Sequence, residues 1–223
     1  MNIIPSLVEQ TADDLFDRIS YLSPYYHQFQ IDIEDGIFIQ NKTLNIEDFV
    51  IYVKSHLSTL SPSFTYDFHF MTQNFEHAIE MINRIKTIIR IDVVFVHTAL
   101  HPNYSLLQKT YPKFRIGLVI NPEEDVKKLN TLFSFKTIPL IQLMTVHPGK
   151  QGQPFIKEVL QKIEQLKNCG FQGKIYLDGA INETTVPFIS SLPYKPDVLC
   201  PGSYLAKAPE GELEKRVNFL STE

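Results

Sequence analysis

Several features that would assign a chain to a particular class are missing from this sequence. Its 223 residues include no tryptophan and only two cysteines, Cys169 and Cys200, whose spacing is not that of a metal site. No apolar run approaches the roughly 20 residues that cross a bilayer, and the N-terminus lacks the basic and apolar segments of a signal peptide. We therefore expect a cytoplasmic protein with reduced thiols and no membrane partner.

An excess of positive charge is absent as well. Lysine and arginine number 21 against 25 acidic residues, for a net charge of −4, and no basic cluster is interleaved with aromatic residues. Proteins that bind nucleic acid usually present a basic face. We therefore do not expect nucleic acid as a partner, and the 43% hydrophobic and 21% charged content is that of an ordinary globular protein.

What the sequence does contain is a regular alternation of strand-like and helix-like segments. Eight short apolar or alternating runs are each followed by a longer helix-like stretch, from 2–8 and 11–23 to 196–202 and 209–222. Such repeats predict a parallel sheet with helical crossovers. Capping residues and first-turn prolines predict helix starts at Thr11, Asn74, Pro122 and Pro154.

Eight βα units in 223 residues fit a closed (β/α)₈ TIM barrel near the small end of its size range. No linker or shift in composition divides the chain, so we expect a single domain over residues 1–223. The alternative is an open doubly wound sheet. It is disfavoured because no Gly-x-Gly-x-x-Gly follows the first strand, where Pro5 and Ser6 stand instead.

One strand of this barrel carries an unexpected set of polar residues. In residues 30–36, QIDIEDG, the side chains of Gln30, Asp32 and Glu34 alternate with two isoleucines and share one face. A barrel strand is covered on both faces, and an ionised carboxylate without a partner in a core is costly. Active sites of TIM barrels lie where strands end. We therefore interpret Asp32 as a site residue and not as part of a solvent-exposed edge.

Two other strand ends carry matching chemistry. His69 lies between two phenylalanines at the end of one run, and Asp178 ends another. Because the carboxyl ends of parallel strands meet at one mouth, Asp32, His69 and Asp178 are predicted to converge. A core histidine is the ordinary interpretation of His69 alone, but the three residues together favour a divalent-metal site or an acid/base pair.

Glycine-containing turns follow the last three strands, as PGKQG at 148–152, DGA at 178–180 and PGS at 201–203. Glycine allows backbone amides to approach an oxyanion, and the loops after strands seven and eight commonly hold phosphate in these barrels. Three such turns at consecutive strand ends indicate a phosphorylated substrate.

Together these residues resemble the ribulose-phosphate 3-epimerase family. The resemblance runs in order from about residue 3 to 206 through IIPSLV, QIDIEDGIFIQN, DFHFMT, FVH, RIGLVINPEE, MTVHPGKQGQPFI, IYLDGAINETT and LCPGSYL. The set formed by MTVHPGKQGQPF, LDGAI and PGS is quite specific. The wider group of ketose-phosphate 3-epimerases, including allulose-6-phosphate epimerases, shares these motifs.

The resemblance implies a TIM barrel of the ribulose-phosphate-binding type that inverts C3 of a ketose phosphate, foremost D-ribulose 5-phosphate to D-xylulose 5-phosphate. Asp32 and Asp178 would be the two acid/base carboxylates, acting through an enediolate. Asp32, His69 and Asp178 would hold a divalent ion (zinc, iron, manganese or cobalt) that stabilises the enediolate. The substrate-binding residues that it implies are Ser6, His69, Gly149, Lys150, Gln151, Gly152, Asp178, Gly179, Ala180, Gly202 and Ser203.

The sequence departs from the family pattern in three places. Gln30 stands where the family has a histidine ligand, Glu34 where it usually has methionine, and Lys150-Gln151 where it usually has Phe-Gly. An amide oxygen is a weaker ligand than imidazole for zinc or iron. We therefore expect a non-standard metal site in which Gln30 or Glu34 takes the place of the missing imidazole, with Glu34 favouring harder ions such as manganese or magnesium. Lys150 either contacts phosphate or faces solvent.

Three functional hypotheses stay open at this point. The first is an epimerase for ribulose 5-phosphate, and the second is an epimerase for another ketose phosphate such as allulose 6-phosphate. The third is a catalytically degenerate barrel that binds a sugar phosphate, for which Gln30 and Glu34 are the evidence. Retention of both Asp32 and Asp178 favours catalysis. The oligomeric state is open too, a homo-oligomer included.

Overall fold

The computed structural model describes residues 1–57, 61–149, 152–209 and 211–222. Its strands are β1 (Asn2–Ile3), β2 (Ser6–Leu7), β3 (Gln28–Glu34), β4 (Thr65–Met71), β5 (Arg90–His97), β6 (Arg115–Ile120), β7 (Leu140–Met144), β8 (Lys174–Asp178) and β9 (Val198–Cys200). Its helices are α1 (Ala12–Leu22), α2 (Ile46–Ser55), α3 (Phe75–Asn83), α4 (Tyr104–Thr110), α5 (Val126–Phe133), α6 (Gln161–Asn168), α7 (Val186–Ser190), α8 (Ser203–Ala206) and α9 (Leu213–Thr222). None of the helices in these ranges is long and apolar enough to cross a membrane.

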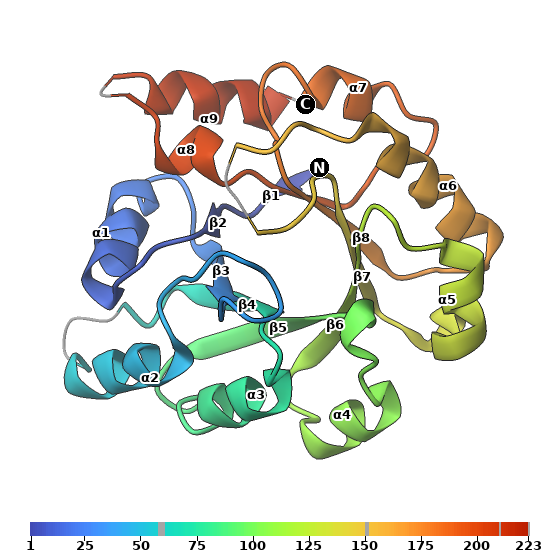
Figure 1. Cartoon of the computed structure of the whole chain (residues 1–223). Coiled ribbons are helices and arrows are strands. Elements are labelled where there is room, and N and C mark those ends of the chain that lie inside the picture. Colours follow the sequence, from blue (N-terminus) through green and yellow to red (C-terminus); the bar gives the residue numbers. More distant parts are fainter. Residues whose placement is uncertain (58–60, 150–151, 210, 223) are drawn as a thin grey trace.

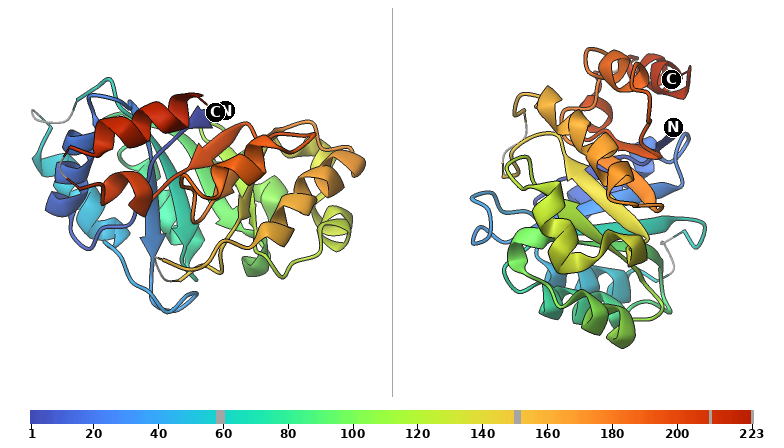
Figure 2. Two further views of the ribbon diagram at one scale, coloured as in Figure 1. Left: turned by 90° about the horizontal axis from the view of Figure 1, so that it is seen from above. Right: turned by 90° about the vertical axis from the view of Figure 1, so that its right-hand side faces the viewer.

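The sheet closes into a barrel through its first strand. β1 pairs with β9 and β2 pairs with β3, so these two short strands are halves of one strand interrupted at Ile4-Pro5. Proline has no amide hydrogen to donate, but the Pro5 carbonyl accepts from Gln30 N at 2.9 Å. All strand pairs are parallel, and the helices lie outside them (Figures 1 and 2). The predicted (β/α)₈ TIM barrel is confirmed.

Side-chain caps mark the starts of α1, α3 and α5. Thr11 and Asn74 cap α1 and α3 through their side chains, as predicted. The starts predicted at Pro122 and Pro154 are wrong, because α5 begins later, capped by Asp125, and a short 3₁₀ turn precedes α6. Proline fixes its own φ, whereas the Asp125 carboxylate satisfies an amide that the first helical turn leaves unpaired.

On β7, β8 and β9 the interior face of the barrel is apolar toward the strand starts and polar at the mouth. One apolar cluster includes Leu140, Tyr176 and Val198. Successive side chains on a strand point to opposite faces, so residues two positions further along share the face of this cluster. Those residues are Gln142, Asp178 and Cys200. The same alternation that fills the interior therefore places polar groups where these strands end.

Another buried carboxylate lies nearer the start of β4. Asp67 has no solvent exposure, and its carboxylate accepts from Gln28 Nε2 at 2.8 Å and from Val93 N at 3.1 Å. The latter contact lies where the register between β4 and β5 shifts. Burial, together with the charge of Asp92, raises the pKa of Asp67 to about 7.

We expect Asp67 to make the free energy of unfolding fall as the pH rises. Its pKa of about 7 in the folded chain exceeds the ordinary value of 3.8, so between these values the folded chain keeps a proton that the unfolded chain has lost. Stabilisation that is complete below about pH 4 is then lost up to about pH 7, by roughly 2 to 4 kcal/mol. Denaturant unfolding at several pH values measures this slope, which should be shallower in D67N. An unchanged slope in D67N would contradict the assignment.

Candidate active site

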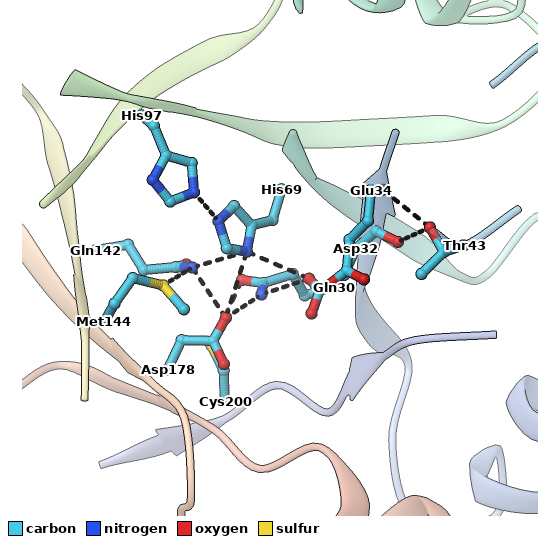
Figure 3. A network of polar contacts seen from close by, with 10 residues as sticks. All are labelled: Gln30, Asp32, Glu34, Thr43, His69, His97, Gln142, Met144, Asp178 and Cys200. Atoms are coloured by element: carbon cyan, nitrogen blue, oxygen red, sulfur yellow. Dashed lines mark hydrogen bonds and ion pairs between the residues drawn. The ribbon is translucent and has the colours of Figure 1, made fainter. Parts of the chain in front are cut away.

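The carboxyl ends of β3, β4 and β8 bring together the three residues that the sequence predicted at one mouth. His69 Nδ1 lies 3.4 Å from Asp32 Oδ1 and 3.4 Å from Asp178 Oδ2 (Figure 3). The register of β3 and β4 pairs Asp32 directly with His69, which is why both side chains lie at the same height in the barrel. All three side chains are buried.

Gln30 lies between the two carboxylates. Its Nε2 donates to Asp32 Oδ1 at 2.9 Å and to Asp178 Oδ2 at 2.7 Å. Its Oε1 accepts from Cys200 Sγ at 3.6 Å, so the buried Cys200 also contacts the site. The carboxamide thus supplies N–H donors to two carboxylates that would otherwise repel one another in a buried position.

A second carboxamide was not singled out by the sequence analysis. Gln142 on β7 donates from Nε2 to Asp178 Oδ2 at 2.9 Å and lies 3.2 Å from His69 Nδ1. The available signal was one polar residue inside the apolar run 140–144, the same kind of signal that marked His69. The two glutamines together orient the Asp178 carboxylate.

His69 and His97 form a pair with a defined direction. Their Nε2 atoms are 2.9 Å apart, so one must donate and the other must accept. Burial and the charge of His69 hold the pKa of His97 well below its usual value. Burial opposes protonation of His69 too, but its hydrogen bonds to Asp178 and Asp32 outweigh burial and raise its pKa to about 9. His69 therefore donates and neutral His97 accepts, so His97 orients the His69 ring.

Two carboxyl groups on β3 have pKa values near neutrality. Burial and the charge of Asp178 raise the pKa of Asp32 to about 6. Burial and the charge of Asp32 raise the pKa of Glu34 to about 7. The Glu34 carboxylate accepts from Asn41 Nδ2, and its backbone N donates to Thr43 Oγ1. Asp32 thus has a pKa suited to both taking and giving a proton near neutral pH.

Asp32, His69 and Asp178 fit a divalent ion. One ligand atom from each lies within 4.8 Å of the others, and two carboxylates with one imidazole are a donor set that first-row ions accept. His97 holds His69 through Nε2, which leaves Nδ1 for the ion. Gln30 would have to turn its carboxamide by half a rotation, because an N–H donor is not a ligand. Glu34 lies outside this group of described residues.

A cavity of about 500 Å³ opens at this end of the barrel. The carboxyl groups of Asp32, Glu34 and Asp178 line it. Of the residues predicted to bind substrate, these also line it: Ser6, Gly149, Gly152, Gly179, Ala180, Gly202 and Ser203. His69, predicted to contact substrate as well, is fully buried and does not line the cavity. Lys150 and Gln151 lie outside the described residues.

Two glycines in the cavity wall leave no room for a side chain. A Cβ at Gly179, where φ is +115°, would lie 2.6 Å from Val146 Cγ2, and one at Gly202 would lie 2.9 Å from Ser6 Oγ. At Gly179, a φ of +115° is adopted without strain only by glycine. The wall is therefore formed by backbone at these positions.

The cavity wall also includes Tyr204 and Arg216, which sequence reasoning missed. Arg216 comes from α9, and the sequence of that segment reads as an ordinary amphipathic helix. It contains no motif, so no local signal was available to find it.

Solved structures of similar shape are TIM-barrel enzymes. A mutant tryptophan synthase α-subunit from Pyrococcus furiosus has a TM-score of 0.68 and 14% identity, covering 100% of this chain and 98% of that one. A 3-hexulose-6-phosphate synthase from Salmonella typhimurium has a TM-score of 0.64 and 14% identity, covering 100% and 97%. At such identities the likeness shows the fold alone.

Sequence comparison is more specific. The ribulose-phosphate 3-epimerase of Bacillus subtilis (strain 168) is 29% identical over 168 residues, 71% of each chain. That of Helicobacter pylori (strain ATCC 700392 / 26695) is 26% identical over 222 residues, 96% of this chain and 94% of the relative. A family model described as "Ribulose-phosphate 3 epimerase family" matches residues 2–204. The chain thus belongs to the ribulose-phosphate 3-epimerase family.

Proposed function

We propose that this protein is an isomerase that inverts C3 of a ketose phosphate, converting D-ribulose 5-phosphate to D-xylulose 5-phosphate. The observation that carries the proposal is the pair Asp32 and Asp178, bridged by Gln30 and lining one cavity. Inversion by proton transfer needs one group to remove a proton and another to deliver one to the opposite face. Membership of the family supports the same reaction.

In each carboxylate, one oxygen accepts a hydrogen bond from Gln30 and the other is available for proton transfer. Asp32 Oδ1 and Asp178 Oδ2 accept from Gln30, and both lie near His69 Nδ1. Asp32 Oδ2 and Asp178 Oδ1 are left to handle the proton. In the proposed reaction one carboxylate takes the C3 proton while the C–H electron pair passes into an enediolate. The other carboxyl, already protonated, gives its proton to the opposite face.

The ion that we propose for the site would be held by Asp32, His69 and Asp178, with Gln30 turned to present Oε1. When bound, it would stabilise negative charge on the enediolate oxygens as a Lewis acid. Zinc, iron, manganese and cobalt are the candidates. An amide oxygen in place of a second imidazole makes the donor set harder than that of the family, so we propose that manganese is favoured over zinc relative to other members.

The glycine-lined part of the cavity would take the phosphate. Backbone amides of Gly179, Ala180, Gly202 and Ser203 are the proposed donors, because no side chain at the two glycines separates the backbone from the cavity. Glu34, two residues after Asp32 on β3, lines the same cavity and would face the sugar hydroxyls. A six-carbon ketose phosphate such as allulose 6-phosphate is the second candidate, because the proposed wall would hold the phosphate group that both sugars share.

We also propose that residues 1–223 form one domain and act in the cytoplasm. All described strands belong to one sheet, which supports a single domain. A sugar phosphate is charged and does not cross a bilayer unaided, so the enzyme must share the compartment in which such sugars are made.

Proton exchange at C3 tests the proposed function. The protein is incubated with D-ribulose 5-phosphate in D₂O with Mn²⁺, Zn²⁺, Fe²⁺ or Co²⁺, and deuterium at C3 and xylulose 5-phosphate are followed by NMR. The expected result is deuterated xylulose 5-phosphate. Exchange without epimerised product would show that only one carboxylate acts. No exchange with either ribulose 5-phosphate or allulose 6-phosphate would overturn the proposal and leave a binding function.

A further inference from the structure

The charges that line the cavity are mainly negative. Asp32, Glu34, Asp178 and Glu183 lie in its wall, and among the described residues Arg216 is the one lysine or arginine there. A phosphate group brings a further charge of about −1.5 to −2 near pH 7. Charges interact more strongly in a partly buried site than in water. A cation in this wall therefore has a large influence on whether a sugar phosphate binds.

Arg216 is held beside α8, the short helix that follows β9. Its Nη1 donates to Tyr204 O at 2.6 Å, and its guanidinium carbon lies 4.8 Å from the centre of the Tyr204 ring. Tyr204 directly follows Gly202 and Ser203, two residues of the proposed phosphate wall. The contacts with Tyr204 therefore place the guanidinium next to that wall.

The guanidinium has donors to spare. It carries five N–H groups, and the contact with Tyr204 uses one of them. Arg18, Arg84 and Arg115 each form an ion pair with a carboxylate, whereas no carboxylate of the described residues lies within ion-pair distance of Arg216. Arg216 is also half-buried, so its charge is less screened than that of an exposed arginine.

We propose that Arg216 is a substrate-binding residue that pairs with the phosphate of the ketose phosphate through the N–H groups that Tyr204 does not use. The identity of the sugar rests on the proposed function, but the class of ligand, a phosphate anion, is what a guanidinium fork recognises. Arg216 offsets the charge of Glu183 in the same wall. It acts at the phosphate and takes no part in the proton transfer between Asp32 and Asp178.

An interaction with the phosphate is made equally in the ground state and in the transition state. Its removal in R216Q therefore raises KM and leaves kcat nearly unchanged. A hydrogen bond to a charged group corresponds to about tenfold in affinity or more, and we expect about that loss. R216K keeps the charge but loses the planar fork, so the affinity for phosphate falls less than in R216Q.

The test uses the full chain and inorganic phosphate as the probe, so it does not depend on turnover. Phosphate binding is measured by calorimetry or by ³¹P NMR, with thermal unfolding of each variant as a check of folding. K215Q is the matched control, because Lys215 lies on the same helix, pairs with Glu212 and does not line the cavity. E183Q removes the opposing charge.

We expect R216Q to bind phosphate about tenfold more weakly, R216K to lose less, K215Q to equal the parent and E183Q to bind more tightly. Phosphate binding that is equal in R216Q and the parent, or absent from the parent, overturns the inference. Should R216Q not fold, R216K and K215Q decide the question. A phosphate affinity that is unchanged in R216K and lowered in K215Q overturns the inference. Phosphate binding that depends on Arg216 without any epimerisation would overturn the proposed function alone.

Discussion

D178N is expected to lower kcat for C3 inversion by ~10²- to 10⁴-fold, the usual contribution of a positioned acid or base. Asparagine keeps the volume, and its Oδ1 can still accept from Gln30 and Gln142, which now hold Asp178 Oδ2. It cannot take or give the proton. D32N is expected to have a comparable effect, because the proposed reaction needs a carboxylate on each face. Turnover is measured with D-ribulose 5-phosphate and with D-xylulose 5-phosphate.

The two variants should also differ from one another in D₂O. Each keeps one carboxylate, so each should exchange the C3 proton of one epimer only, without forming product. D67N is the matched control, because Asp67 is a buried carboxylate of the same barrel that lies away from the cavity, and its turnover should match that of the parent. Conversion at the parent rate in both D32N and D178N would be incompatible with a two-carboxylate mechanism.

Q30H is expected to raise the affinity for zinc. It replaces an amide, which must turn before it can act as a ligand, with an imidazole at the position where the family has one. Changes to groups that merely support a metal ligand alter affinity by about 10- to 100-fold, and a gained ligand should do at least as much. Metal content after purification and competition with a chromophoric chelator measure the effect without any turnover.

E34M provides the comparison at the second departure from the family. The Glu34 carboxylate accepts from Asn41 and is not part of the Asp32, His69 and Asp178 group, so E34M should leave zinc affinity near that of the parent. A large loss in E34M would instead make Glu34 the replacement ligand. Stoichiometric zinc in the parent, held no more tightly in Q30H, would argue that Gln30 already ligates well.

Local patterns in the sequence were sufficient for several residues of the site. The two-residue period of QIDIEDG identified Asp32, and single polar residues at strand ends identified His69 and Asp178. Gln142 carries the same signal inside an apolar strand, so it was within reach of the same reasoning. The helix start expected at Pro122 failed because the Asp125 side chain caps α5 three residues later. The start expected at Pro154 failed because a 3₁₀ turn without a side-chain cap precedes α6.

The sequence by itself determined the alternation of strands and helices, the closed barrel that it implies, and the strand ends at which chemistry is placed. These follow from periodicity and turn residues, which are local properties of the chain. Only the tertiary structure decided that Gln30 donates to Asp178, 148 residues away, that His69 donates to His97, and that Arg216 reaches the cavity. Such contacts depend on the closure of the barrel and on the packing of α9. No local pattern encodes them, because the partners are far apart along the chain and come close only when the barrel folds.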